Sequence, residues 1–173
     1  KHDRRALVAP QPRTTRVGTV PDLIALRLPR GPTFVDELRR AFDEGHAVLP
    51  IEVRLPEQLT RSLLDTLRPR WIVDVDDPAC DRQTLNGHVE VLAGDAVVIA
   101  TSGSTGVAKG VVHTHDSIAA SAAATNAGVG TVPDRDRWLC ALPVAHVAGL
   151  SVVLRARCSG TPVEVLPGFD PDA

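Results

Sequence analysis

The sequence has no methionine and no tyrosine, and only 3% of its 173 residues are aromatic. Because many proteins that bind single-stranded nucleic acid stack bases on aromatic rings, this scarcity argues against that class. The formal net charge of -2 gives no general attraction to nucleic acid or to anionic membranes. Since methionine is absent even from position 1, we expect residues 1–173 to be part of a longer chain.

Cysteines and long apolar runs are also scarce. The three cysteines are odd in number and share no Cys-x-x-Cys spacing, which disfavours a disulfide framework and a structural zinc site; they are Cys80, Cys140 and Cys158. Free thiols fit a reducing compartment, and we expect a cytoplasmic protein. No apolar run approaches the roughly 20 residues that span a bilayer, and no apolar segment of a secretory signal follows the basic start.

Hydrophobic periodicity predicts helices that alternate with short strands. We expect helices at 33–44, 56–68, 116–128 and 147–158, the first capped by Thr33 and the third by Asp116. The buried sides of the first two helices are predicted at Phe34, Leu38, Phe42, Leu59, Leu63 and Leu67. Strands are expected at 47–51, 71–75, 96–100, 110–113, 138–142 and 162–166, with a surface loop at 76–87. This alternation indicates an α/β fold, a layered sheet flanked by helices.

A segment rich in glycine and hydroxyl groups, residues 101–110, directly follows the strand expected at 96–100. Phosphate oxygens need many donors in a small volume, which glycine backbone N–H groups, hydroxyls and a lysine can provide. We expect these donors at Thr101, Ser102, Gly103, Ser104, Thr105, Gly106, Lys109 and Gly110. The segment is not a Walker A loop, because Gly110 stands where that motif has Ser or Thr. The alternative is a flexible linker, which the position between two expected strands disfavours.

The segment 141–150 contains a second candidate, His146, at the junction of an expected strand and an expected helix. A histidine there can donate to a carboxylate and lies near a helix N-terminus. The alternative is a structural histidine packed in the core. Two weaker candidates read more simply as structure: the pair His113 and His115 lacks an evident third metal ligand, and the acidic residues Asp74, Asp76 and Asp77 fit a charged loop.

Residues 101–110 resemble the signature of the adenylate-forming superfamily, which includes acyl-CoA synthetases, luciferases and the adenylation domains of peptide synthetases. Residues 141–150 resemble a second motif of that superfamily, whose histidine lines the acyl and adenylate pocket. Three positions depart from the usual pattern: Ala100 and Ala145 stand where an aromatic residue is common, and Ala108 stands where proline is common.

The resemblance implies that residues 1–173 are the front part of the large N-terminal domain of an adenylate-forming enzyme. It implies that a carboxylate attacks the α-phosphate of ATP to give an acyl-adenylate, and that CoA then displaces AMP. Lys109 and His146 would be the catalytic residues, and Thr105 would bind Mg²⁺. The expected partners are a small carboxylic acid, ATP and CoA, with no nucleic acid and no membrane span, and a homodimer is left open.

The early position of the loop and several flanking stretches are similar to o-succinylbenzoate–CoA ligases of menaquinone biosynthesis, in their short actinobacterial form. These stretches are 67–73, 138–150, Arg155 and 160–162. The alternatives are another aryl- or fatty-acyl-CoA ligase, and a nucleotide-binding remnant that performs no chemistry. The resemblance implies that the acidic metal motif, the ribose-binding aspartate and a further catalytic lysine lie beyond Ala173. We therefore expect the 173 residues alone to be inactive.

Overall fold

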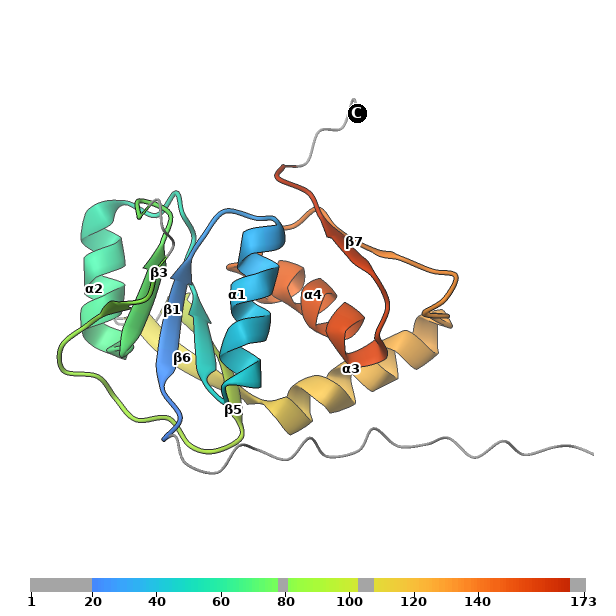
Figure 1. The fold of residues 1–173 in the computed structure, drawn as a ribbon, viewed down its shortest axis with the longest axis horizontal. Helices are drawn as coiled ribbons and strands as arrows, with labels where there is room; N and C mark the ends of the chain where they lie inside the picture. The colour runs from blue at the N-terminus through green and yellow to red at the C-terminus, as the bar shows by residue number, and fades with distance from the viewer. Residues whose placement is uncertain (1–19, 78–80, 103–107, 169–173) are drawn as a thin grey trace, which may run out of the picture.

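The computed structural model describes residues 20–77, 81–102 and 108–168, and its centre is a six-stranded sheet (Figure 1). The strand order is β4-β3-β1-β2-β5-β6. The four strands β1, β2, β3 and β5 run parallel, whereas β4 and β6 run antiparallel to their neighbours. Their bounds are Leu23–Arg27 for β1, Ala47–Pro50 for β2, Trp71–Asp74 for β3, Gln83–Thr84 for β4, Asp95–Ser102 for β5 and Ala108–Thr114 for β6.

A separate two-stranded sheet and four helices complete the fold. The small sheet pairs β7 (Trp138–Cys140) with β8 (Val163–Val165) in parallel. The helices are α1 (Pro32–Asp43), α2 (Glu57–Leu67), α3 (His115–Val129) and α4 (Val147–Ser159). The expected α/β fold, a layered sheet flanked by helices, is confirmed. None of the helices in the described ranges is long and apolar enough to cross a membrane.

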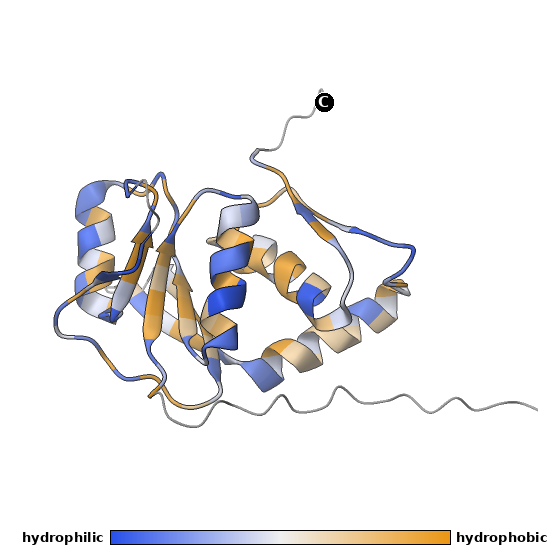
Figure 2. Cartoon of the chain, viewed as in Figure 1, coloured by the Kyte–Doolittle hydropathy of each residue, from blue (hydrophilic) through white to orange (hydrophobic). Residues whose placement is uncertain are grey.

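Strand β1 lies at the centre of the sheet and is buried on both faces. Its side chains alternate, so Ile24 and Leu26 pack with α1 and α4, whereas Leu23 and Ala25 pack on the side of α2. All four side chains are at most 3% exposed. The hydropathy colouring in Figure 2 follows this arrangement, with the most hydrophobic ribbon on the strands and mixed colouring on α1 and α2. We did not predict this strand from the sequence, although its apolar run stands between Pro21 and Pro29.

The structure corrects both predicted helix caps. Thr33 is not the cap of α1, which begins at Pro32, because the fixed φ of proline suits the first helical position. Asp116 is not the cap of α3. Thr114 holds that place, and its hydroxyl oxygen accepts a hydrogen bond of 3.2 Å from the backbone N–H of Ser117. Asp116 instead lies in the first turn, where a negative charge complements the helix dipole.

The predicted buried side of α2 was wrong at one position. Leu59 is 55% exposed, and Thr60 is buried in its place. The buried stripe follows positions i, i+3, i+4 and i+7, namely Thr60, Leu63, Leu64 and Leu67, because this face meets the sheet. The loop expected at 76–87 also contains the short strand β4, which pairs with β3.

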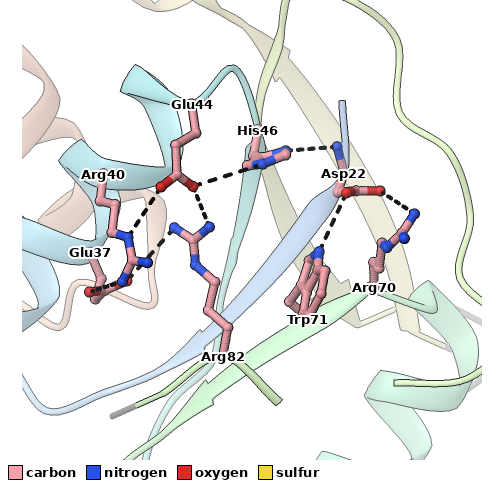
Figure 3. Close-up of polar contacts among 8 residues, drawn as sticks. All are labelled: Asp22, Glu37, Arg40, Glu44, His46, Arg70, Trp71 and Arg82. Atoms are coloured by element: carbon pink, nitrogen blue, oxygen red, sulfur yellow. Dashed lines mark hydrogen bonds and ion pairs between the residues drawn. The ribbon is translucent and has the colours of Figure 1, made fainter. Parts of the chain in front are cut away.

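A network of charged side chains holds the region around β4 to the C-terminal part of α1 (Figure 3). Arg82 forms ion pairs with Glu37 and Glu44, and Arg40 of α1 lies 3.2 Å from Glu44, the residue that caps the end of this helix. The side chain of Arg82 is only 14% exposed. Two arginines and two glutamates therefore balance one another at this partly buried position, which ties the polypeptide after β3 to a helix that precedes it in the chain.

His46 extends this network towards the start of β1. Its Nδ1 accepts a hydrogen bond of 3.1 Å from the backbone N–H of Asp22, so the imidazole is neutral in this arrangement. Burial lowers the pKa of His46. The positive charges of Arg82 and Arg70 add to this effect, whereas Asp22 and Glu44 oppose it. The folded protein therefore favours the uncharged form of this histidine.

We predict that protonation of His46 destabilises the fold. The pKa of His46 in the folded protein lies below the ordinary value of 6.5. The contribution of His46 to the free energy of unfolding is therefore present above pH 6.5 and is lost as the pH falls through the lowered pKa. His46→Asn keeps an acceptor for the backbone N–H but cannot be protonated. Thermal unfolding between about pH 7.5 and 5 should show a flatter pH dependence in this variant. His88→Asn, at an exposed loop position, should retain the original slope; equal slopes in all three proteins would contradict the prediction.

Candidate functional site

The segment rich in glycine and hydroxyl groups closes a hairpin between β5 and β6. The two strands pair antiparallel up to Thr101 opposite Lys109 and Ser102 opposite Ala108. The connection between them, which includes the predicted phosphate ligands Gly103, Ser104, Thr105 and Gly106, lies outside the described residues, so their roles stay predictions. Strand β5, which runs parallel to β2, ends at Ser102, and the carboxyl ends of parallel strands form the edge at which α/β sheets bind ligands.

Thr101 and Lys109 flank this connection on facing strands. Both residues are exposed. The hydroxyl of Thr101 donates a hydrogen bond of 3.3 Å to the carbonyl oxygen of Lys109, which fastens the two strands where they approach the connection. An exposed lysine carries a mobile positive charge, and the hairpin holds its backbone in one register at this edge of the sheet.

Gly110 has a different structural role from the one we expected. It lies within β6 opposite Ala100, in extended strand backbone, so it does not supply an unusual backbone angle. The physical reason for glycine is close packing. A Cβ atom at this position would lie 2.7 Å from Cγ1 of Val98 and 3.1 Å from Cδ2 of Leu67. A side chain at residue 110 would therefore displace Val98 and crowd Leu67, so glycine suits the close approach of α2 to the hairpin.

His146 is the residue that precedes helix α4. Its backbone N–H donates to the carbonyl of Pro143 at 3.2 Å, and its own carbonyl accepts from the N–H of Leu150 at 3.0 Å. The residue is exposed, and its side chain makes no capping hydrogen bond to the helix. His146 is therefore not a histidine packed in the core. Whether its imidazole turns towards the connection at 103–107 stays a prediction.

A cavity of about 320 Å³ lies between the β5–β6 hairpin and helices α3 and α4. Its walls are mostly apolar, with three serines, one histidine and one arginine. The lining residues are Val97, Ile99, His113, Ser117, Ile118, Ser121, Ala122, Val147, Leu150, Ser151, Leu154 and Arg155. No carboxylate is among these described residues. Val147 follows His146 directly, so the cavity reaches the first turn of α4.

Arg155 is the charged residue of this cavity. Its guanidinium carbon lies 5.8 Å from the centroid of the Trp138 ring, a cation–π arrangement. Its Nε is buried, and in the part of the chain that the structure describes it has no hydrogen-bond partner. Sequence reasoning noted Arg155 only within a resemblance. The sequence could have indicated that Arg155 shares a helix face with Ser151 and Val147, because it stands four residues after the first and eight after the second.

The weaker candidates are engaged in structural contacts. The ring of His115 packs edge-on against Phe42 at 4.8 Å, and burial lowers its pKa. Asp74 and Asp76 both pair with Arg27 at 2.7 Å. Within residues 20–77, 81–102 and 108–168, no group of three or more His, Cys, Asp or Glu side chains is arranged to hold a metal ion.

Comparisons with known proteins agree with this geometry. The chain matches the AMP-binding enzyme family over residues 64–173, and it belongs to that family. Its fold is similar to that of the O-succinylbenzoate CoA synthetase of Bacillus subtilis, solved with ATP and a magnesium ion. That match has a TM-score of 0.69 and 22% identity, and covers 87% of this chain and 46% of the other.

Two sequence relatives illustrate the range of similar ligases. A 2-succinylbenzoate–CoA ligase of Listeria monocytogenes is 42% identical over 79 residues, which are 46% of this chain and 17% of the relative. A long-chain-fatty-acid–CoA ligase of Mycobacterium tuberculosis is 45% identical over 73 residues, which are 42% of this chain and 14% of the relative. The matched segments thus span less than a quarter of the length of either relative.

The packing around Gly110 leads to a prediction of stability. Gly110→Ala should destabilise the protein by about 1–3 kcal/mol, because the new methyl group overpacks the contact with Val98 and Leu67. Gly128→Ala is the matched control. It adds the same methyl group to α3, where nothing lies within 4 Å, and should stabilise by up to about 1 kcal/mol. Urea unfolding measures both free energies, and an unaltered free energy in Gly110→Ala would contradict the packing argument.

Proposed function

We propose that the whole protein is an ATP-dependent acid–CoA ligase. It activates a carboxylic acid as an acyl-adenylate and then transfers the acyl group to the thiol of CoA. The observation that carries this proposal is the β5–β6 hairpin. Its connecting segment has the superfamily's signature sequence and follows the carboxyl end of β5, a parallel strand, and Val97, Ile99 and His113 of the same hairpin line an apolar cavity. Membership of the AMP-binding enzyme family supports the nucleotide part of the proposal.

In the first half-reaction, a carboxylate oxygen attacks the α-phosphorus of ATP and pyrophosphate leaves. The substrate carboxylate is already a nucleophile, so catalysis consists mainly of positioning and of neutralising the charge of the leaving group. Lys109 and the hydroxyls of the connecting segment would hold the β- and γ-phosphates. Thr105 is the candidate ligand for Mg²⁺, which would share that negative charge. In the second half-reaction, the sulfur of CoA attacks the acyl carbon and AMP leaves.

The cavity favours an acid that carries a second negative charge. Its volume of about 320 Å³ is at the lower end of the range for small-molecule pockets. The apolar walls suit an aromatic or aliphatic body, and Arg155 stands without an acidic partner among the residues that line the cavity. A guanidinium pairs well with a carboxylate in a fork geometry. We therefore propose o-succinylbenzoate, a dicarboxylate, as the substrate, which would place the protein in menaquinone biosynthesis.

A fatty-acyl–CoA ligase is the second candidate, and the Mycobacterium tuberculosis relative favours it. A long alkyl chain has no second charge and would leave Arg155 unpaired in an apolar cavity, which costs free energy. A remnant without chemistry is the third candidate. Formation of AMP distinguishes these candidate functions, because only a ligase produces AMP and only the correct acid stimulates AMP formation.

We predict that Lys109→Ala slows acid-dependent exchange between ATP and pyrophosphate about ten- to a hundredfold, the usual effect of losing a charge-assisted contact worth about 1.5–3 kcal/mol. Lys109 is exposed, so the thermal midpoint should change little. Lys109→Arg keeps the charge and should retain more activity. Unchanged exchange in Lys109→Ala would show that this lysine does not hold the phosphates.

A second prediction concerns the acid. The whole protein should form AMP with o-succinylbenzoate and CoA, and should ignore palmitate. Arg155→Ala should raise KM for o-succinylbenzoate about ten- to a hundredfold, because a charged hydrogen bond is lost. Arg157→Ala, which removes an exposed arginine two residues further along α4, is the control and should leave KM unchanged. A clear preference for palmitate or benzoate would reject the dicarboxylate assignment.

A further inference from the structure

One side chain from a distant part of the sequence fastens the loop between β7 and α4 to the main sheet. Nη1 of Arg30 donates a hydrogen bond of 3.0 Å to the carbonyl oxygen of Ala141, although 111 positions separate the two residues. Arg30 follows the carboxyl end of β1, and Ala141 follows β7. Because β7 and β8 form a sheet of their own, this bond joins the small sheet to the central strand of the large one.

The backbone on the Arg30 side of this bond has little freedom. Leu28, two residues earlier, is buried in the core with 3% exposure. Gly31 follows with a φ of 146°, in the region that favours glycine, and Pro32 begins helix α1 with its φ fixed by the ring. The guanidinium therefore projects from a turn that is anchored by the core on one side and by a helix on the other.

The loop on the other side of the bond is joined to α4 as one unit. The thiol of Cys140 is buried and lies 3.5 Å from the carbonyl oxygen of Leu142 and 3.4 Å from that of Gly149. Helix α4 approaches the loop so closely that a Cβ atom on Gly149 would lie 2.3 Å from the carbonyl oxygen of Pro143. Val144, between them, is 3% exposed. A displacement of Ala141 would therefore move the first turn of α4 with it.

His146 lies in the loop between Ala141 and α4, and the direction of its side chain depends on the contacts that hold this loop. Within the described part of the chain, its imidazole has no hydrogen bond or ion pair, whereas its backbone N–H and carbonyl are both bonded. Because no partner among the described residues holds this exposed side chain, only the position of its backbone limits where the imidazole can lie. The position of the loop relative to the main sheet therefore decides where this imidazole can reach.

We propose that Arg30 is a positioning residue for His146. Its hydrogen bond to Ala141 sets the β7–α4 loop against the carboxyl end of β1, at the same edge of the sheet as the β5–β6 hairpin. The imidazole is thereby held in register with the bound acid and nucleotide. The catalytic part of this inference rests on the proposed ligase function, whereas the structural part stands on the geometry of the loop.

The activity test is a double-mutant cycle on acid-dependent exchange between ATP and pyrophosphate. Arg30→Ala should raise KM for the acid or lower kcat about tenfold and leave KM for ATP unchanged, because the acid loses an oriented partner. Arg30→Lys, which can still donate to the carbonyl, should restore part of the loss. In a His146→Ala background, Arg30→Ala should have little further effect. Additive losses would overturn the proposal, because Arg30 would then act independently of His146.

Hydrogen exchange of the backbone provides a readout that does not depend on activity. Arg30→Ala should increase exchange at residues 144–150 and leave the interior of α1 unaffected. Arg39→Ala removes an arginine of α1 that is 57% exposed and pairs with Asp36, and it should change neither exchange at the loop nor activity. Unaltered exchange at 144–150 in Arg30→Ala would overturn the proposal. Absence of any acid-dependent activity in the unaltered protein would instead reject the ligase function, and hydrogen exchange would still decide whether Arg30 holds the loop.

Discussion

Burial of β1 on both faces is the constraint on which the rest of the structure depends. A central parallel strand has no solvent side, so helices must cover the sheet above and below it. Its alternating side chains join two clusters, one with Phe34 and Leu38 of α1 and the other with Leu63 of α2. The β–α–β connections that follow bring the carboxyl ends of β1, β2, β3 and β5 to one edge of the sheet, which is where the candidate site lies.

The site combines parts that differ in how firmly the fold holds them. The β5–β6 hairpin belongs to the main sheet, and the absence of a side chain at Gly110 lets α2 pack against it. The loop with His146 belongs to the small sheet and meets the main one through Arg30 and through the packing of α4 on the core. The proposed two-substrate reaction would need both parts in register, so the contacts between the sheets would matter as much as the groups that touch the substrates.

Partial burial changes what the charge of Arg155 can bind. On the surface, an arginine of this kind would be one of many solvated cations. Between α4 and Trp138, its guanidinium is partly desolvated over an aromatic face and beside a cavity with apolar walls. A partly desolvated cation with no carboxylate among the described residues that line its cavity favours an anionic ligand. This electrostatic selection, rather than the apolar volume alone, distinguishes a dicarboxylate from a fatty acid in the proposed function.

The sequence by itself determined the α/β class, most element positions and the place of the segment 101–110 between two strands. It could do so because periodicity and turn chemistry act over a few neighbouring residues. It missed β1 and wrongly placed Leu59 on a buried face, since both depend on which faces meet in space, and it also misplaced two helix caps. Only the tertiary structure decided why residue 110 is glycine, which residues line the cavity beside Arg155, and that Arg30 reaches Ala141. The physical reason is that contacts between residues far apart in the sequence, such as Leu67 with Gly110 and Arg30 with Ala141, leave no periodic signal.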